Sequence, residues 1–180
     1  MSPRLRKLAL TAHVGSSVGW LGAVAAFLVL AIAGLTTDDP EVAGGVYIAT
    51  DLLTWFVLVP LALASLLTGV VQSLGSPWGL FRHYWVLAKL ILTAVATVVL
   101  LLQTGGIADL GAQAAEGTLA VGQGGNARAS LVLHAAGGFV VLVLTTVLAI
   151  YKPPGRTRYG QRKSDDPRSG ILISRSARAQ

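Results

Sequence analysis

Among the ionisable side chains within or beside the long apolar runs of this sequence, the five that could carry chemistry are His13, Asp51, His83, Lys89 and His134. A charged Asp or Lys at the centre of a membrane-spanning helix costs about 2.5 to 3.5 kcal/mol, so such residues tend to face the bundle interior and to serve a function. An imidazole can bind a metal or a haem iron or carry a proton, and a carboxylate can orient it. These five side chains are therefore the candidates for a functional site.

The composition predicts a surface covered by lipid rather than by water. The chain has 180 residues, of which 53% are hydrophobic and only 12% are charged, and its mean hydropathy is +0.67. A soluble domain carries about 25% charged residues. The sequence therefore predicts an integral membrane protein.

No pattern in the sequence identifies an enzyme. HExxH and Walker motifs are absent, so neither a zinc hydrolase nor a P-loop nucleotide-binding protein is indicated. Cysteine is absent and Met1 is the only methionine, which excludes disulfides, thiolate metal sites and a methionine-lined path for soft metals. The net charge of +6 arises largely in the C-terminal tail, which does not indicate a nucleic-acid-binding domain.

Four apolar runs are each long enough to cross the hydrocarbon core, which requires about 20 residues. They predict an all-α, four-transmembrane-helix bundle in residues 1–151, with spans at about 8–35, 46–74, 84–103 and 129–151. The connections are TTDDPEVAGG, GSPWGLFRH and the Gly- and Ala-rich stretch 104–128, which is expected to be a mobile outer loop.

The positive-inside rule predicts that both termini are cytoplasmic. The cations on that side are Arg4, Arg6, Lys7, Arg82, Lys152, Arg156 and Arg158, whereas the opposite side has only Arg128. The expected location is the cell membrane, as a multi-pass protein of a bacterial inner membrane. A competing interpretation is a cleaved secretory signal formed by RLRK, the first apolar run and AIAG.

The tail, residues 152–180, begins KPPG and carries eight of the fourteen Lys and Arg residues. Two prolines after a span end the helix, and the mixed charge that follows is typical of disorder. The basic residues could contact anionic lipid, at about 1 kcal/mol each, or could serve only as a topology anchor.

Helical spacing assigns the polar residues to faces. In the first span, one face holds His13, Ser16, Ser17, Trp20, Val24 and Phe27. The nearly opposite face holds Gly15, Gly19, Gly22 and Ala26, and small residues at such intervals let a neighbouring helix approach closely. We therefore expect the first span to be the central helix, with a polar side and a close-packing side.

The other spans carry comparable stripes. In the second span the stripe is Asp51, Thr54, Trp55, Leu58, Ala62, Ser65, Gly69, Gln72 and Ser73; in the third, Arg82, Trp85, Lys89, Thr93, Ala96 and Gln103; in the fourth, Ser130, His134, Gly138 and Thr145. The residues expected in the polar interior are His13, Ser17, Trp20, Asp51, Trp55, Lys89 and His134.

Depth along the spans predicts which side chains can meet. His13, His83 and Lys89 fall in the inner leaflet, so His13 and Lys89 are expected neighbours, and a haem b held by two histidines would use His13 and His83. Asp51 and His134 fall near the outer surface as an expected pair. His13 and His134 differ in depth by about 20 Å, too far to share an iron.

Each of these residues also has a structural interpretation. His83 could contact lipid headgroups at the interface. Lys89 could extend its ammonium to the inner boundary, and Asp51 could cap the second span near its outer end.

Two segments, HVGSSVGWLGAVAAF and YWVLAKLILTAVATVVLLL, resemble those of small bacterial integral membrane proteins of uncharacterised function. More distantly, the four spans resemble the membrane domain of copper resistance protein D, through His13, Trp20, Gly22 and Lys89. The resemblance implies a four-helix fold and a metal- or haem-related role. The chain lacks Cys, any Met after Met1 and a His cluster in an outer loop, which puts copper transport in doubt.

Three functions remain open from the sequence. The first is a non-enzymatic membrane protein whose polar interior supports packing or a partner subunit. The second is a haem- or metal-binding protein that uses intramembrane histidines. The third is a small transporter or proton relay in which Asp51, His134 and Lys89 line a path.

Overall fold

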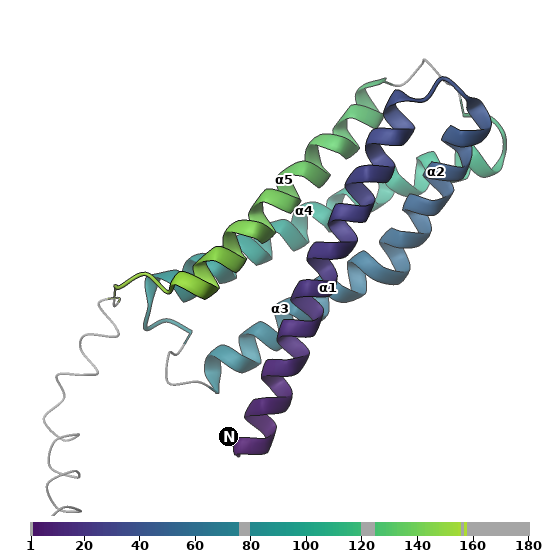
Figure 1. Ribbon diagram of the computed structural model, residues 1–180. Coiled ribbons are helices and arrows are strands. Elements are labelled where there is room, and N and C mark those ends of the chain that lie inside the picture. The colour runs from purple at the N-terminus through teal and green to yellow at the C-terminus, as the bar shows by residue number, and fades with distance from the viewer. Residues whose placement is uncertain (1, 76–79, 120–124, 156, 158–180) are drawn as a thin grey trace, which may run out of the picture.

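The structure is a computed structural model, and it describes residues 2–75, 80–119, 125–155 and 157. All elements of these ranges are helical (Figure 1). They are α1 (Pro3–Thr36), α2 (Pro40–Leu53), the π-helical segment η1 (Thr54–Leu58), α3 (Val59–Leu74), α4 (Tyr84–Ala115) and α5 (Gly125–Tyr151).

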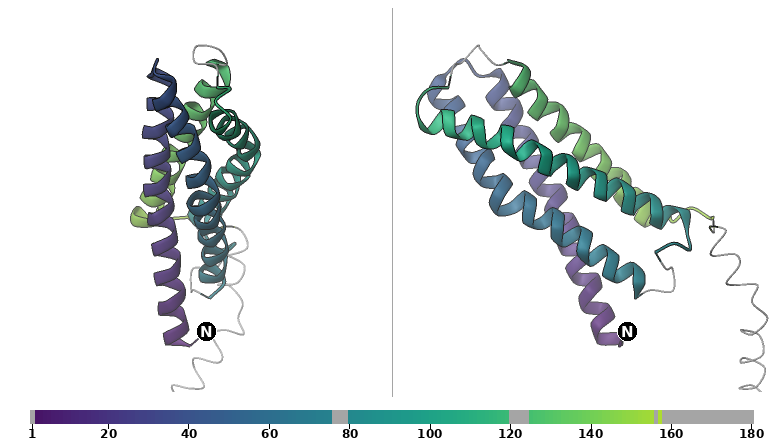
Figure 2. Two further views of the ribbon diagram at one scale, coloured as in Figure 1. Left: turned by 90° about the vertical axis from the view of Figure 1, so that its right-hand side faces the viewer. Right: turned by 180° about the vertical axis from the view of Figure 1, so that it is seen from behind.

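Helices α2, η1 and α3 make one continuous rod, so the elements form four rods in all. Successive rods run antiparallel (Figures 1 and 2). The first rod, α1, packs against α2, α3 and α5, and α4 packs against the same three helices. We call the end with Pro3 and Tyr151 the basal end and the end with Thr36 and Gly125 the apical end (Figure 1). Helix α1 is the most buried of the four rods and α4 is the least buried, which agrees with the predicted central position of the first span.

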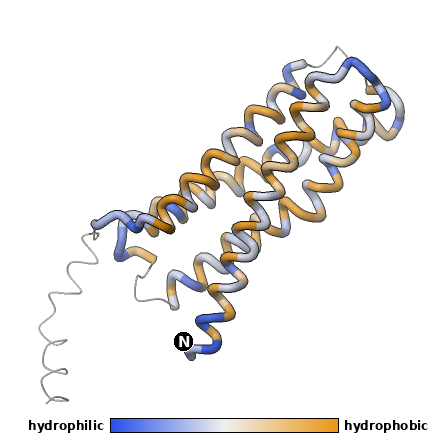
Figure 3. The backbone as a smooth tube through the Cα atoms, in the orientation of Figure 1, coloured by the Kyte–Doolittle hydropathy of each residue, from blue (hydrophilic) through white to orange (hydrophobic). Residues whose placement is uncertain are grey.

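The four rods are 27 to 35 residues long, and each is apolar enough to cross a membrane. At 1.5 Å per residue they exceed the roughly 30 Å of a hydrocarbon core. Apolar residues dominate the middle of the bundle, and hydrophilic residues gather at its two ends (Figure 3). The predicted four-helix bundle is confirmed, and its four rods have the length and apolar character that a multi-pass membrane protein requires.

Two helices extend well beyond the predicted spans. The second rod begins at Pro40, because the carboxylate of Asp39 accepts hydrogen bonds from the backbone N–H groups of Glu41 and Val42 and so caps the helix. Proline lacks a backbone N–H, but at the first helical position this N–H would have no partner within the helix, so Pro40 costs no hydrogen bond. The acidic connection thus contributes a helix start.

The predicted outer loop 104–128 is wrong over most of its length. Helix α4 continues to Ala115 and ends where Gly117 adopts φ +69°, a left-handed conformation that glycine adopts without strain. Helix α5 already begins at Gly125. The predicted disorder of the tail concerns residues that lie, apart from 152–155 and 157, outside the described ranges.

The π-helical turn η1 directly precedes Pro60. Its last bond runs from the N–H of Val59 to the carbonyl of Thr54, five residues back. Proline donates no backbone hydrogen bond, and its ring crowds the carbonyl four residues earlier. A single wide turn relieves that clash, a common use of π-bulges.

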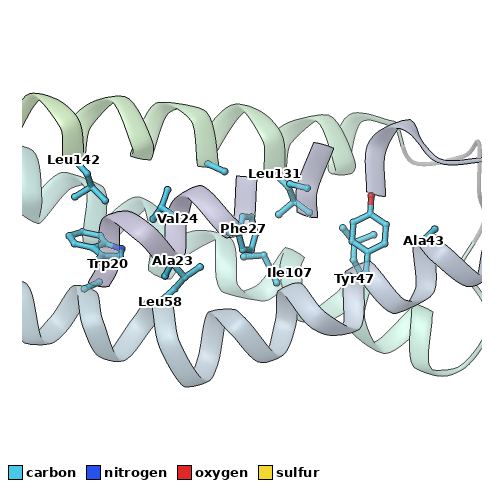
Figure 4. Close-up of a cluster of buried hydrophobic side chains, with 14 residues drawn as sticks. Trp20, Ala23, Val24, Phe27, Ala43, Tyr47, Leu58, Ile107, Leu131 and Leu142 are labelled. Carbon is cyan, nitrogen blue, oxygen red and sulfur yellow. The ribbon is translucent and has the colours of Figure 1, made fainter. Parts of the chain in front are cut away.

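The predicted inward face of the first span is confirmed. Ser16, Trp20, Val24 and Phe27 are buried, and the aromatic side chains point into the core shown in Figure 4. The predicted close-packing glycine side is wrong: within the described residues Gly15 and Gly22 have no neighbour within 4 Å of an added Cβ, and Gly19 alone meets another helix, at Leu61. That face is left for lipid.

Candidate functional site

The basal half of the bundle contains a cavity between α1, α3, α4 and α5, which we call the basal cavity. It has two chambers of about 150 and 520 Å³. The side chains that line both chambers are His13, Ser65, Gln72, Trp85, Lys89 and Thr93. The structure therefore brings His13 and Lys89 together on the wall of one cavity, as the depth argument predicts.

His13 is held in one orientation by α3. Its Nδ1 lies 3.1 Å from the backbone oxygen of Ser65 and 3.3 Å from Oγ1 of Thr68. A carbonyl only accepts hydrogen bonds, so Nδ1 carries a hydrogen and donates. The ring packs on Gly69, where an added Cβ would stand 2.9 Å from His13 Cε1. Gly69 thus provides the space that the imidazole occupies.

Ser17 joins the same wall by a direct bond between helices. Its Oγ lies 2.8 Å from Oγ of Ser65, one buried hydroxyl on α3 opposite one on α1. This bond and the one made by His13 fix α1 against α3 at the floor of the cavity.

We expect Ser65→Ala to lower the free energy of unfolding by about 0.6 kcal/mol, an average value for a hydrogen bond between membrane helices. Unfolding in mixed micelles, followed by circular dichroism, measures the change. In a double-mutant cycle, Ser17→Ala should cost little more once Ser65 is alanine. Fully additive losses would contradict the bond.

The basal cavity is basic. The Nζ of Lys89 lies 5.9 Å from the centroid of the Trp85 ring, a cation–π contact, and Lys152 lines the larger chamber. Among the described residues, neither chamber is lined by Asp or Glu. The buried Oε1 of Gln72 has no hydrogen-bond partner there. This cavity is therefore suited to a negatively charged ligand, to which it offers both hydrogen-bond donors and a hydrogen-bond acceptor.

His83 lies apart from His13. It is the residue before the first turn of α4, with its ring centroid 6.3 Å from that of Trp85, and it lines neither chamber. A haem held between the two histidines does not fit this arrangement, and no group of three His, Cys, Asp or Glu gathers in the described ranges. Within the described ranges there is thus no three-ligand metal site, and the two histidines expected to hold a haem do not share one cavity.

The expected Asp51–His134 pair is wrong. Asp51 packs against α4, where an added Cβ on Gly111 would lie 2.9 Å from Asp51 Cβ, and its buried Oδ1 has no hydrogen-bond partner among the described residues. His134 is exposed, and its Nδ1 bonds to Ser130 of its own helix. The two side chains leave their helices toward different neighbours.

Trp20 and Trp55 take opposite positions. Trp20 is 2% exposed and lies in the core, whereas Trp55 is 49% exposed, so its predicted place in the polar interior is wrong. Trp55 lies within η1, where the wide π-turn changes the angle between successive side chains. Thr54 and Leu58 occupy the buried side of that turn.

Sequence reasoning missed a buried arginine at the apical end. Arg128 is 5% exposed, and its guanidinium carbon lies 5.4 Å from the centroid of the Tyr47 ring. The sequence places Arg128 in the predicted outer loop and therefore does not predict this contact. The signal was its position just before the fourth apolar run, where a longer helix places it inside the bundle.

The cavities also separate the residues expected to form a proton path. Lys89 lines the basal cavity, His134 lines a different and apolar cavity, and Asp51 lines neither. The arrangement joins His13 with Lys89 and leaves Asp51 and His134 in separate surroundings. Searches with family models, against curated proteins and against solved structures find no match.

Proposed function

We propose that this multi-pass membrane protein is a non-enzymatic binding protein whose basal cavity holds an amphiphile with a phosphate or carboxylate head. The observation that carries the proposal is the convergence of His13 and Lys89 on one cavity lined by no carboxylate of the described ranges. A cation in a low-dielectric surrounding needs a counter-charge. A bound oxyanion supplies it.

Hydrogen-bond geometry supports an oxyanion head. Because Nδ1 of His13 is used by Ser65, its Nε2–H would donate to the ligand once the ring is protonated, and the ammonium of Lys89 supplies further donors. Hydroxyls of Thr93 and Ser17 line the same space. Charge-assisted bonds of this kind are about twice as strong as neutral ones.

The walls of the larger chamber support an apolar tail on the ligand. Val14, Val18 and Ile150 line it and are also exposed on the outside of the bundle. The chamber therefore continues to the lipid-facing surface between α1 and α5. A membrane amphiphile could enter sideways and leave its chain among the lipid tails.

In this proposal the protein lies in a bacterial inner membrane and its basal end faces the cytoplasm, as the distribution of cations predicts. In such a membrane the cytoplasmic leaflet carries anionic lipids. The His13–Lys89 pair and the basic tail would lie on this side. Contact of the tail with these lipids is part of the same proposal. From the distant resemblance to copper resistance protein D the proposal keeps only the four-helix fold, since no three-ligand metal site forms among the described residues.

Replacing Lys89 by glutamine tests the site. We expect binding of radiolabelled dodecyl phosphate to protein in phosphatidylcholine nanodiscs to weaken about tenfold or more, because a hydrogen bond to a charged group contributes about 1.5 to 3 kcal/mol. The matched control is Lys7→Gln, which removes the same charge from an exposed position on α1 outside the cavity and should leave the affinity unchanged.

Two results would count against the proposal. Equal affinity of the wild type and Lys89→Gln for dodecyl phosphate would overturn the site. Inorganic phosphate in place of dodecyl phosphate distinguishes the source of the head: equal affinity for both would mean that the tail contributes nothing and that the ligand is a free oxyanion.

A further inference from the structure

We infer a second ligand site, independent of the basal cavity, in which His134 receives the hydroxyl of a membrane-soluble hydroquinone. The site is an apolar cavity of about 380 Å³ between α1, α4 and α5. Its volume falls within the range of about 300 to 1,000 Å³ typical of small-molecule sites, which are mostly apolar with few polar groups. We call it the apolar cavity.

The walls of the apolar cavity are suited to a flat, neutral ring. Trp20 and Phe27 of α1 contribute aromatic surface, and Leu58, Leu131 and Leu142 contribute aliphatic surface. Figure 4 shows these side chains in the core between the helices. No Lys, Arg, Asp or Glu of the described ranges lines the cavity. A charged ligand would therefore have no counter-charge here.

One edge of the cavity is polar and is built by two helices. Gln103 Nε2 lies 3.4 Å from Oγ of Ser130, and Ser130 Oγ lies 3.1 Å from Nδ1 of His134. Nδ1 also lies 2.7 Å from the backbone oxygen of Ser130, which can only accept. The hydrogen of neutral His134 therefore sits on Nδ1, and Nε2 offers a lone pair.

That lone pair lies where water is scarce. His134 is nine residues after Gly125, the start of α5, or roughly 14 Å along the helix. It is exposed, and no hydrogen bond of Nε2 occurs among the described residues. A polar group facing hydrocarbon without a partner is costly. A ligand that brings a hydroxyl to this edge removes that cost.

A hydroquinone matches both parts of the site. Its ring fits between aromatic and aliphatic walls, its hydroxyl donates to Nε2 of His134, and Gln103 retains a second N–H and its oxygen for the same head. An isoprenoid tail would lie in the surrounding lipid. A helix from a second copy could also meet His134, but its convex surface would leave the cavity unfilled, and unfilled space forfeits contacts.

The test compares two ligands that differ only in the donor. The first is a decyl-substituted benzohydroquinone kept reduced, and the second is its dimethyl ether, which has the same body and no hydroxyl. With protein in phosphatidylcholine nanodiscs and empty nanodiscs as background, we expect saturable quenching of tryptophan fluorescence by the hydroquinone. The ether should bind about tenfold more weakly, as expected when a buried acceptor is left unpaired.

Two variants make the result specific. His134→Phe keeps a ring of similar size but accepts no hydrogen bond, and should reduce hydroquinone affinity to that of the ether. The matched control is His83→Phe, the same substitution outside the apolar cavity. Gly137→Leu adds a side chain at a cavity position with no neighbour within 4 Å of its Cβ, and should block both ligands while the helices stay folded.

Three outcomes would overturn the inference. They are equal binding of hydroquinone and ether, unchanged affinity in His134→Phe, and a dimer that His134→Phe separates into monomers without any hydroquinone binding to wild type. Lys89→Gln should leave hydroquinone binding intact, so failure here is distinguishable from failure of the proposal for the basal cavity.

Discussion

Gly34→Ala is expected to lower the free energy of unfolding by about 1 to 3 kcal/mol, the usual cost of inserting a methyl group into a packed core. The added Cβ would stand 2.9 Å from Cζ and 3.0 Å from Oη of Tyr47, and 3.0 Å from Cγ1 of Val46. Tyr47 is 1% exposed and has Arg128 over its ring. The ring has no free space to move into, so α1 and α2 must separate.

The matched control is Gly22→Ala on the same helix, where nothing lies within 4 Å of the added Cβ. Its effect should be neutral or slightly stabilising, since alanine is favoured over glycine by about 1 kcal/mol in helices. Unfolding of both variants in mixed micelles of dodecyl maltoside and dodecyl sulfate, followed by circular dichroism, gives the comparison. Equal stability of the two variants would contradict the close contact between α1 and Tyr47.

Gly69→Ala should destabilise the protein by a similar amount, about 1 to 3 kcal/mol, and should also weaken binding in the basal cavity. The new Cβ would lie 2.9 Å from Cε1 and 3.3 Å from Nδ1 of His13. The imidazole would have to leave the position in which Nδ1 donates to the backbone oxygen of Ser65. The contact that holds His13 in the wall of the basal cavity would then be lost.

A second substitution tests whether His13 is the cause. In a His13→Ala background the imidazole is absent, so Gly69→Ala should cost almost nothing, and the two changes should be strongly non-additive. Thermal unfolding of the four proteins of the cycle measures this. If Gly69→Ala costs as much without the imidazole as with it, the contact between Gly69 and His13 does not control this helix pair.

The two ends of the bundle use glycine in the same way. Gly34 makes room for Tyr47 and Gly111 makes room for Asp51 at the apical end, while Gly69 makes room for His13 at the basal end. Each of these glycines faces one large or polar side chain of a neighbouring helix. Of the glycines spaced regularly on α1, Gly15 and Gly22 have no such neighbour, which is why the stripe of small residues misidentified the packing surface.

Helical spacing predicted the inward faces because burial follows the 3.6-residue period over several turns. The stripe from Thr54 to Ser65 is buried, and so is that from Ser16 to Phe27. The exceptions are Trp55, at the π-turn, where the period itself changes, and His134, which is exposed. A proline in the sequence indicated that the helix would be disturbed there but not how the disturbance would be absorbed.

The sequence alone determined the four apolar rods and most of their inward faces, because these follow from length, hydropathy and helical period. The positions of His13 and Lys89 along their spans were enough to predict that they lie near each other, and both line one cavity. Only the tertiary structure decided which faces meet. It turned Asp51 toward Gly111 and left His134 beside Gln103 and Ser130, because partner choice depends on how neighbouring helices cross and rotate, which no single helix encodes.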